Sequence, residues 1–416
     1  MEGAGGRQVS ADEKAVDITA LVVNYNSTRL AEEMLQSLAS QQARSPEGRK
    51  LSIEFVFVDN ASPMQDPEAL ADIQKLAQER LPGQLVMHDE NLGYAGGMNL
   101  AHDHAKGEYM LVLNPDLVFM PGCVEALYAH LRSHPGTGAC GPIGYWDRGK
   151  EVRLPPNILP TLGDLWSCTL AHVFDSANRR YIERRMKGAL RTYRAKEDIE
   201  LDMLSGACLM LPSSVIRAMG SFWDASFPLY YEDTDLFRRI GKLGKKLVQV
   251  DGAEIAHFYN RSATTNQGEA MRRYWIAKRR YYRKYYGPVG AWLEALSRRF
   301  LQSRLSERAR KHLESRVVDM GDVSEPPTLD LGRHCEDYLI EICQDAAFLL
   351  AAGILGSGSS WTPGPSFWNA FGNSEYYLRC IDISGDRAEE LVVYRFRRIS
   401  HPALPEEPRL SSVSGA

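Results

Sequence analysis

The sequence predicts an α/β protein with a mostly parallel sheet that helices cover on both faces. Between residues 18 and 257, short apolar and β-branched runs alternate with longer helical patterns, which is the rhythm of βαβ units. The short runs are apolar almost throughout, rather than at every second position. Such runs indicate strands that are buried on both faces.

The strands are predicted in a regular order along this part of the chain. They occupy residues 18–23, 53–58, 84–88 and 109–113, and a further strand-like run covers 246–250. A helical pattern at 27–38 follows the first strand, and amphipathic stretches separate the others. Ligands of such sheets bind beyond the carboxyl ends of the strands, so the residues that follow each strand are the first candidates for function.

Composition and charge exclude several classes of protein. The chain has 416 residues, 44% of them hydrophobic, and 49 Lys and Arg against 53 Asp and Glu give a net charge of −4. These values exclude a fully disordered chain and argue against a protein that coats nucleic acid. Seven scattered cysteines without a C-x-x-C pair fit a reducing compartment. We expect a cytoplasmic protein without a signal peptide or membrane-spanning segment.

Shifts in composition divide the chain into five predicted sections. We expect a flexible tail at 1–16, a main domain at 17–265, a basic helical segment at 266–318, a small α+β unit at 319–400 and a second flexible tail at 401–416. Within the small unit, the pattern predicts a linker at 319–327, a helix near 336–355, and strands near 376–383 and 391–397. The role of this unit is left open.

The basic segment is rich in aromatic residues. Residues 272–316 hold 14 Lys and Arg against three Glu. Three uses are open: peripheral contact with the inner face of a membrane through residues 271–316, a solvated or packing face, and, as the weakest, nucleic-acid binding.

Polar residues follow the predicted strands at four places. The clusters are Asn24 to Ser27, Asp59 to Ser62, Asn91 to Asn99, and Asn114 to Asp116. Each could be a turn or helix cap, because Asn, Asp, Ser and Gly are common there. Four clusters at successive strand ends favour a binding site over this simpler interpretation.

Seven segments occur in order along the first two thirds of the chain: VVNYNS, FVFVDNAS, ENLGYAGGMN, LNPD, DMLSGACLMLP, FPLYYEDTDLFRR and AHFYNRSA. Together they resemble the family 2 glycosyltransferases, and more narrowly the rhamnosyltransferase-like branch. The resemblance spans about residues 17–280. It implies the Rossmann-like GT-A fold, an inverting sugar transfer from a nucleotide-diphosphate donor, and a divalent cation, Mg²⁺ or Mn²⁺.

The resemblance also implies which residues hold the donor, a dTDP- or UDP-sugar. The Asp59 carboxylate can accept the imide N–H of thymine or uracil, although guanine could also donate to it. Asn114 is expected at the ribose. The remaining implied contacts come from the strand ends and the glycine-rich segment: Asn24, Asn26, Asn60, Ser62, Asn91, Gly93, Gly97 and Asn99.

The metal ligands and the catalytic base follow from the same resemblance. Asp116 and His257 are the implied metal ligands, and Asn114 stands where the family usually has the first Asp of a D-x-D motif. Hard cations prefer oxygen ligands and offset the charge of a diphosphate. Asp233 is the implied general base and Glu232 helps to bind the acceptor. Both acids could instead cap a helix.

The expected function is therefore metal-dependent, inverting transfer of a sugar, with rhamnose as one candidate. The acceptor would be a glycan or lipid-linked glycan in polysaccharide or cell-surface glycan biosynthesis. One alternative is a nucleotidyltransferase that makes nucleotide sugars, but the chain lacks a basic, glycine-rich signature near its N-terminus. A non-catalytic glycan-binding protein is the second alternative. The sequence does not predict an oligomeric state.

Overall fold

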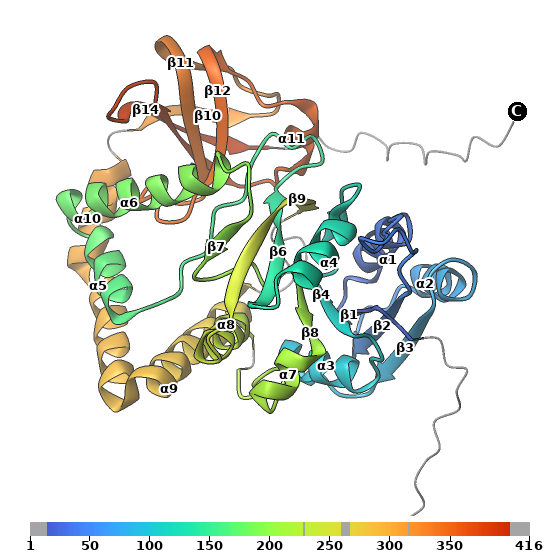
Figure 1. The fold of residues 1–416 in the computed structure, drawn as a ribbon. Coiled ribbons are helices and arrows are strands. Elements are labelled where there is room, and N and C mark those ends of the chain that lie inside the picture. Colours follow the sequence, from blue (N-terminus) through green and yellow to red (C-terminus); the bar gives the residue numbers. More distant parts are fainter. Residues whose placement is uncertain (1–14, 228, 259–266, 315–316, 400–416) are drawn as a thin grey trace, which may run out of the picture.

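The computed structural model describes residues 15–227, 229–258, 267–314 and 317–399. The predicted tails at 1–16 and 401–416 therefore lie almost entirely outside the described residues. The first part of the chain forms a nine-stranded sheet in the order β3-β2-β1-β4-β8-β6-β9-β5, with β7 beside β9 (Figure 1). Its strands are β1 (Ile18–Asn24), β2 (Ile53–Asn60), β3 (Gly83–His88), β4 (Tyr109–Leu113), β5 (Leu117–Phe119), β6 (Thr137–Tyr145), β7 (Ile199–Leu201), β8 (Cys208–Pro212) and β9 (Lys246–His257).

The parallel part of this sheet is the part that the sequence predicts best. β3, β2, β1 and β4 are parallel neighbours, and β6 is parallel to β9. β8 runs antiparallel to β4 and β6, and β5 and β7 run antiparallel to β9. The four predicted strands up to residue 113 are confirmed, and the run at 246–250 extends to His257.

Helices bury both faces of the sheet, as predicted. Ile18, Ala20 and Val22 of β1 face one core, while Leu21 and Val23 face the other, because successive strand residues point to opposite sides. The first core is covered by α1 (Thr28–Ala39), α2 (Pro67–Glu79) and α4 (Cys123–Ser133). The second core is covered by α3 (Gly93–Asp103), α7 (Ser213–Met219) and α8 (Glu232–Lys242).

Four further helices connect and brace the sheet: α5 (Leu162–Ala171), α6 (Asp175–Tyr193), α9 (Gln267–Leu301) and α10 (Arg304–Glu314). α9 bends at Gly287, whose φ of 67° is not helical, directly before Pro288. Tyr281 and Tyr282 of α9 are almost completely buried in a cluster with Leu165. Part of the predicted basic, aromatic segment therefore serves as a packing face.

Asp235, on α8, holds α9 against that helix. Its side chain is fully buried, and its Oδ2 accepts a hydrogen bond of 2.8 Å from Arg239 Nε. Its Oδ1 accepts hydrogen bonds from the Tyr285 hydroxyl at 2.6 Å and from Lys284 Nζ. Two cations and a hydroxyl thus compensate the burial of this carboxylate.

The chain ends in a second sheet of five strands in the order β10-β14-β13-β11-β12. Its elements are β10 (Val318–Val323), β11 (Leu329–Cys343), β12 (Ala352–Trp361), α11 (Pro365–Ala370), β13 (Glu375–Asp382) and β14 (Glu389–Arg398). The strands predicted near 376–383 and 391–397 are confirmed as β13 and β14.

Two local predictions for this unit are wrong. The helix predicted near 336–355 is instead the end of β11, a turn and the start of β12. The segment consists of short apolar runs, and periodicity alone does not distinguish such a run in a buried strand from one in a buried helix. The predicted linker at 319–327 contains β10, which pairs in parallel with β14.

The second sheet packs against the segment that follows β6 and against α6 (Figure 1). Arg153 and Gly353 exchange two backbone hydrogen bonds of 2.9 Å, and Glu151 Oε1 accepts a hydrogen bond of 3.1 Å from Trp361 Nε1. Tyr193 of α6 is buried with Leu339 of β11. The two sheets are therefore joined by hydrogen bonds and by a shared apolar contact.

The packing of α9 on α8 leads to a stability prediction. Asp235→Ala should lower the free energy of unfolding by about 3–5 kcal/mol, because Arg239 and Lys284 lose a buried counter-charge. Asp224→Ala is the control: Asp224 is a partly exposed partner of Lys284, at 2.7 Å, and its loss should cost under about 1 kcal/mol. Chemical denaturation measures both, and equal losses would contradict the anchoring role of Asp235.

Candidate active site

The polar strand ends that the sequence singles out meet at one edge of the large sheet. β1, β2 and β4 are parallel neighbours, so the residues that follow them lie side by side. Hydrogen bonds join β1 to the loop after β2, and the loop after β2 to the start of α3. The expectation that these clusters converge is confirmed by the register of the strands.

The first group links the ends of β1 and β2. Asn24 and Asp59 are buried, and Asn24 Nδ2 donates to Asp59 Oδ2 at 2.7 Å. Asp59 Oδ1 accepts from the Ser62 backbone N–H at 3.0 Å, and Ser62 Oγ accepts from the Asn26 backbone N–H at 3.0 Å. Asn26 has a φ of 57°. These bonds fix the two loops against each other, and each Asp59 oxygen keeps a lone pair for a further donor.

The second group holds the glycine-rich segment. Asn60 Nδ2 donates to Asn91 Oδ1 at 3.2 Å and to the Gly93 carbonyl at 3.1 Å. Asn60 Oδ1 accepts from the Leu92 N–H at 2.9 Å. Gly93 has a φ of 71°, which favours glycine at this turn into α3. Asn60 and Asn91 thus set the position of the N-terminus of α3.

Two predicted donor contacts have other partners in this structure. A Cβ on Gly97 would lie 2.9 Å from a Val23 methyl carbon, so glycine allows α3 to approach β1. The Asn99 amide exchanges two hydrogen bonds with the Trp223 backbone, at 3.0 and 2.9 Å. Gly97 and Asn99 therefore position α3, and their contact with a donor stays a prediction.

Asp116 and His257 come together through the pairing of β5 with β9. In this antiparallel pair Leu117 is opposite His257, and the Phe258 N–H donates to the Asp116 carbonyl at 3.0 Å. Both side chains are buried, with Asp116 Oδ1 3.3 Å from His257 Nε2. A carboxylate oxygen and an imidazole nitrogen thus lie in direct contact inside the protein.

Glu232 and Asp233 open α8 directly after two strained residues. Tyr230 and Tyr231 have φ values of 69° and 67°, a conformation that costs free energy for a residue with a side chain. Asp233 Oδ1 accepts from the Thr234 N–H at 2.6 Å. A Cβ on Gly206 would lie 2.8 Å from Asp233 Cβ, so the loop before β8 packs on this side chain.

Both acids hold their protons more tightly than ordinary carboxyl groups. Burial, followed by the charge of Asp233, raises the pKa of Glu232 to about 8. Burial also raises the pKa of Asp233, although the hydrogen bonds from Thr234 oppose this rise. Glu232 Oε2 has no hydrogen-bond partner among the described residues. At neutral pH Glu232 is therefore largely protonated, and the pair carries fewer than two negative charges.

Tyr94 is the residue that sequence reasoning missed. Its hydroxyl donates to Asn114 Oδ1 at 3.1 Å. Burial raises the pKa of Tyr94 well above its ordinary value, and the charges of Glu232, Asp233 and Asp116 raise it further. This tyrosine is thus bonded to Asn114 and feels the charges of both the acid pair and Asp116. Its place within the glycine-rich segment was the available signal, but the type of residue alone gave no role.

Asp116 and His257 fit a divalent cation as a partial ligand set. Oxygen and imidazole ligands suit such ions, and the two ligand atoms face each other inside the protein. The residues described by the structure contain no group of three or more His, Cys, Asp or Glu side chains that could hold a metal ion. A cation here would therefore need further ligands from the diphosphate of the donor and from water.

Comparison with known proteins agrees with this geometry. The sequence profile described as glycosyl transferase family 2 matches residues 19–216. The chain is 26% identical over 260 residues to N-acetylglucosaminyl-diphospho-decaprenol L-rhamnosyltransferase of Mycobacterium tuberculosis. This alignment covers 58% of this chain and 75% of the relative.

Solved structures with a similar arrangement include a mannosyltransferase from Pyrobaculum calidifontis in complex with GDP-Man and Mn²⁺ (TM-score 0.44, 16% identity, 72% of this chain and 75% of that chain). TarS from S. aureus in complex with UDP-GlcNAc is also similar (TM-score 0.41, 17% identity, 64% of this chain and 66% of that chain). The matched profile covers the strand-end clusters, from β1 through α7. Residues 19–216 thus match the glycosyl transferase family 2, and the chain is a glycosyltransferase.

Proposed function

We propose that this enzyme transfers a sugar from a dTDP- or UDP-linked donor to a glycan or lipid-linked acceptor, with inversion at the anomeric carbon. Tyr94 carries the proposal, because it lies within electrostatic reach of both Asp116 and the Glu232–Asp233 pair. The site thus has Asp233, which can take a proton, close to Asp116, which can face a diphosphate. Rhamnose is the first donor sugar to test, since the curated relative is a rhamnosyltransferase.

In this mechanism Asp233 removes the proton of the acceptor hydroxyl as that oxygen attacks the anomeric carbon. The hydrogen bonds from Thr234 to Oδ1 orient the carboxylate and leave Oδ2 for the acceptor. Glu232, protonated at neutral pH, can donate a hydrogen bond to the acceptor without adding a second charge. A single displacement needs one base, which distinguishes this site from the paired acids of glycoside hydrolases.

The strand-end network would hold the nucleoside, with Asp59 accepting the imide N–H of the base. Asp116 and His257 would hold Mg²⁺ or Mn²⁺, which offsets the charge of the leaving diphosphate when it is bound. Tyr94 keeps Asn114 in place through its hydrogen bond, and Asn114 is left to meet the ribose with its amide N–H groups.

We also propose that the second half of α9 contacts the surface of an anionic membrane. Val289, Trp292 and Leu296 are 64%, 62% and 41% exposed and lie on one side of the helix, with Arg299 exposed one turn further along. Exposed aromatic and aliphatic residues beside arginines suit lipid headgroups. Within the described part of the chain, the helices are all too short or too polar to cross a bilayer.

The base has a direct test. Asp233→Asn should lower the rate of sugar transfer by roughly 10²–10⁴-fold, because no group then removes the acceptor proton. Binding of UDP or dTDP, measured by calorimetry, should stay unchanged. Asp103→Asn, at the exposed end of α3, is the matched control and should keep full activity. Normal turnover by Asp233→Asn would remove this residue from the mechanism.

The metal ligands are tested by titration with dTDP, UDP and GDP, each with and without Mn²⁺. Mn²⁺ should tighten binding of dTDP or UDP by about tenfold or more, equal to ~1.4 kcal/mol. Asp116→Ala should remove this gain while metal-free binding persists. A gain of the same size in Asp116→Ala would show that the cation binds elsewhere.

The raised pKa of Glu232 predicts how stability depends on pH. The unfolded chain ionises this group near pH 4.5, while the folded chain keeps it protonated up to about pH 8. The raised pKa therefore has no effect on stability at pH 4 and destabilises the fold increasingly as the pH rises toward 8. Glu232→Gln should raise the melting temperature at pH 8 by a few degrees and leave it unchanged at pH 4. An equal change at both pH values would contradict this.

The membrane contact is tested by sedimentation with lipid vesicles. The wild type should bind vesicles that contain phosphatidylglycerol and should bind pure phosphatidylcholine vesicles weakly. Trp292→Glu should reduce binding by about tenfold or more, because a charge replaces the exposed ring. Phe174→Glu changes another exposed ring, at the start of α6, and should have no effect. Equal binding to both lipids would overturn the proposal.

A further inference from the structure

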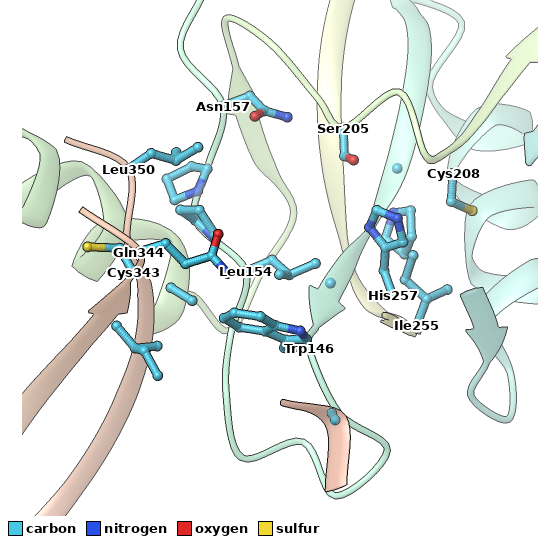
Figure 2. A pocket seen from close by; sticks show the side chains of 18 of the residues that line it. Trp146, Leu154, Asn157, Ser205, Cys208, Ile255, His257, Cys343, Gln344 and Leu350 are labelled. Atoms are coloured by element: carbon cyan, nitrogen blue, oxygen red, sulfur yellow. The ribbon is translucent and has the colours of Figure 1, made fainter. Parts of the chain in front are cut away.

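A cavity of about 620 Å³ lies between the two sheets of the molecule. Residues of β6, β8 and β9 form one wall, and residues of β11, β12, α11 and β13 form the other. Figure 2 shows Gln344, from the C-terminal sheet, reaching toward Trp146, with His257 and Ser205 on the far side of the space. The volume is in the range of ordinary small-molecule sites. The C-terminal unit thus completes a pocket that the glycosyltransferase domain leaves half open.

The lining of this cavity is uncharged. Among the described residues that form it there is no Asp, Glu, Lys or Arg, although a quarter of the whole chain is charged. Apolar side chains alternate with the amides of Asn157, Gln249 and Gln344. A diphosphate would find no opposite charge here. Asn157 Nδ2 already donates to the Leu204 carbonyl at 3.0 Å, but a lipid tail would offer no hydrogen bond to the amides of Gln249 and Gln344, which costs free energy.

Trp146 supplies a rigid aromatic surface in the cavity. Its ring contacts Phe367 and Phe371 of the C-terminal unit, with centroids 5.7 and 6.0 Å apart. Gln344 Nε2 donates to Ser374 Oγ only at 3.4 Å, a long bond that a ligand hydroxyl can replace. Aromatic faces with amide groups beside them match a sugar ring, which has apolar C–H faces and a rim of hydroxyls.

The cavity also reaches the catalytic groups. His257 lines it, and His257 Nε2 is 3.3 Å from Asp116 Oδ1. Ser205 lines it too, and the next residue, Gly206, packs on the Asp233 side chain. A ligand in the cavity would therefore contact His257, which neighbours Asp116, and would be separated from Asp233 by the Ser205–Gly206 loop.

We propose that this cavity binds the neutral saccharide portion of the acceptor, and that the C-terminal sheet is the acceptor-recognition unit of the enzyme. The inference rests on the proposed function. The glycosyltransferase domain binds the nucleotide at its strand ends, and the C-terminal unit selects the sugar that receives the transferred residue.

The test uses saturation-transfer NMR on the full chain with methyl glycosides of glucose, galactose, mannose and N-acetylglucosamine, and with methyl glucuronide as a charged probe. At least one neutral glycoside should bind, and the glucuronide should bind more weakly. Gln344→Ala, which removes an amide, and Ser374→Trp, which fills the cavity, should each weaken binding by about tenfold or more. Glu336→Ala, exposed on the same strand β11 and outside the cavity, should leave it unchanged.

Calorimetry with UDP and dTDP on the same samples separates the possible failures. Nucleotide binding by the variants shows that they are folded, and if Ser374→Trp does not fold, Gln344→Ala decides alone. If the wild type binds a nucleotide but no neutral glycoside, or if Gln344→Ala binds the glycoside as the wild type does, the acceptor cavity is overturned and the proposed function stands. If the wild type binds no nucleotide, the proposed function itself fails.

Discussion

The pairing of β9 with its neighbours is the constraint on which the site depends. β9 pairs with β5, β6 and β7, so one strand connects the edge of the large sheet to its centre. The register that places Leu117 opposite His257 also sets Asp116 beside the imidazole. A slip of one residue would turn His257 to the other face of the sheet and separate the two groups. The same strand carries Gln249 and His257 into the cavity wall, so one set of backbone hydrogen bonds fixes both halves of the site.

The start of α8 contains several features that cost free energy of folding, and the rest of the fold must offset this cost. Two tyrosines in left-handed conformations precede a buried Glu232, and Asp233 follows it. Asp235, three residues after Glu232, binds two cations and a hydroxyl. The aromatic face of α9 packs over the same helix. Asp235, whose charge is compensated, therefore stabilises the same helix that carries Glu232, whose burial is poorly compensated. This arrangement explains why a basic segment that resembles a surface feature has two of its tyrosines, Tyr281 and Tyr282, buried inside the protein.

The sequence predicts the parallel half of the large sheet and the convergence of its strand ends, because those strands are long apolar runs with polar residues at fixed offsets. It also indicates the Asp116–His257 pair through the resemblance to a family, though not the β5–β9 register that produces it. The C-terminal helix prediction fails because the apolar residues near Leu339 suit a buried strand as well as a helix. The cavity could not be predicted at all, since Trp146 and Gln344 are distant in the sequence and meet only when the sheets pack. The motif around Asn99 likewise gave no sign of the Trp223 backbone as the partner of its amide, and the contact of Asn99 with a donor stays a prediction.

The distribution of charge gives a physical reason for two units in one enzyme. A nucleotide diphosphate needs charge and hydrogen-bond donors, whereas a neutral sugar is best recognised by aromatic faces and amides with little charge nearby. One pocket that served both would leave the acids without partners when the neutral ligand is bound, or would bury a diphosphate against apolar walls. In this chain the acids lie at the strand ends and the start of α8, and the uncharged surface lies where the second sheet meets the first. His257 and the Ser205–Gly206 loop are the boundary between the two environments. On the proposed function, changes in the C-terminal sheet would alter the choice of acceptor while the donor chemistry stays intact.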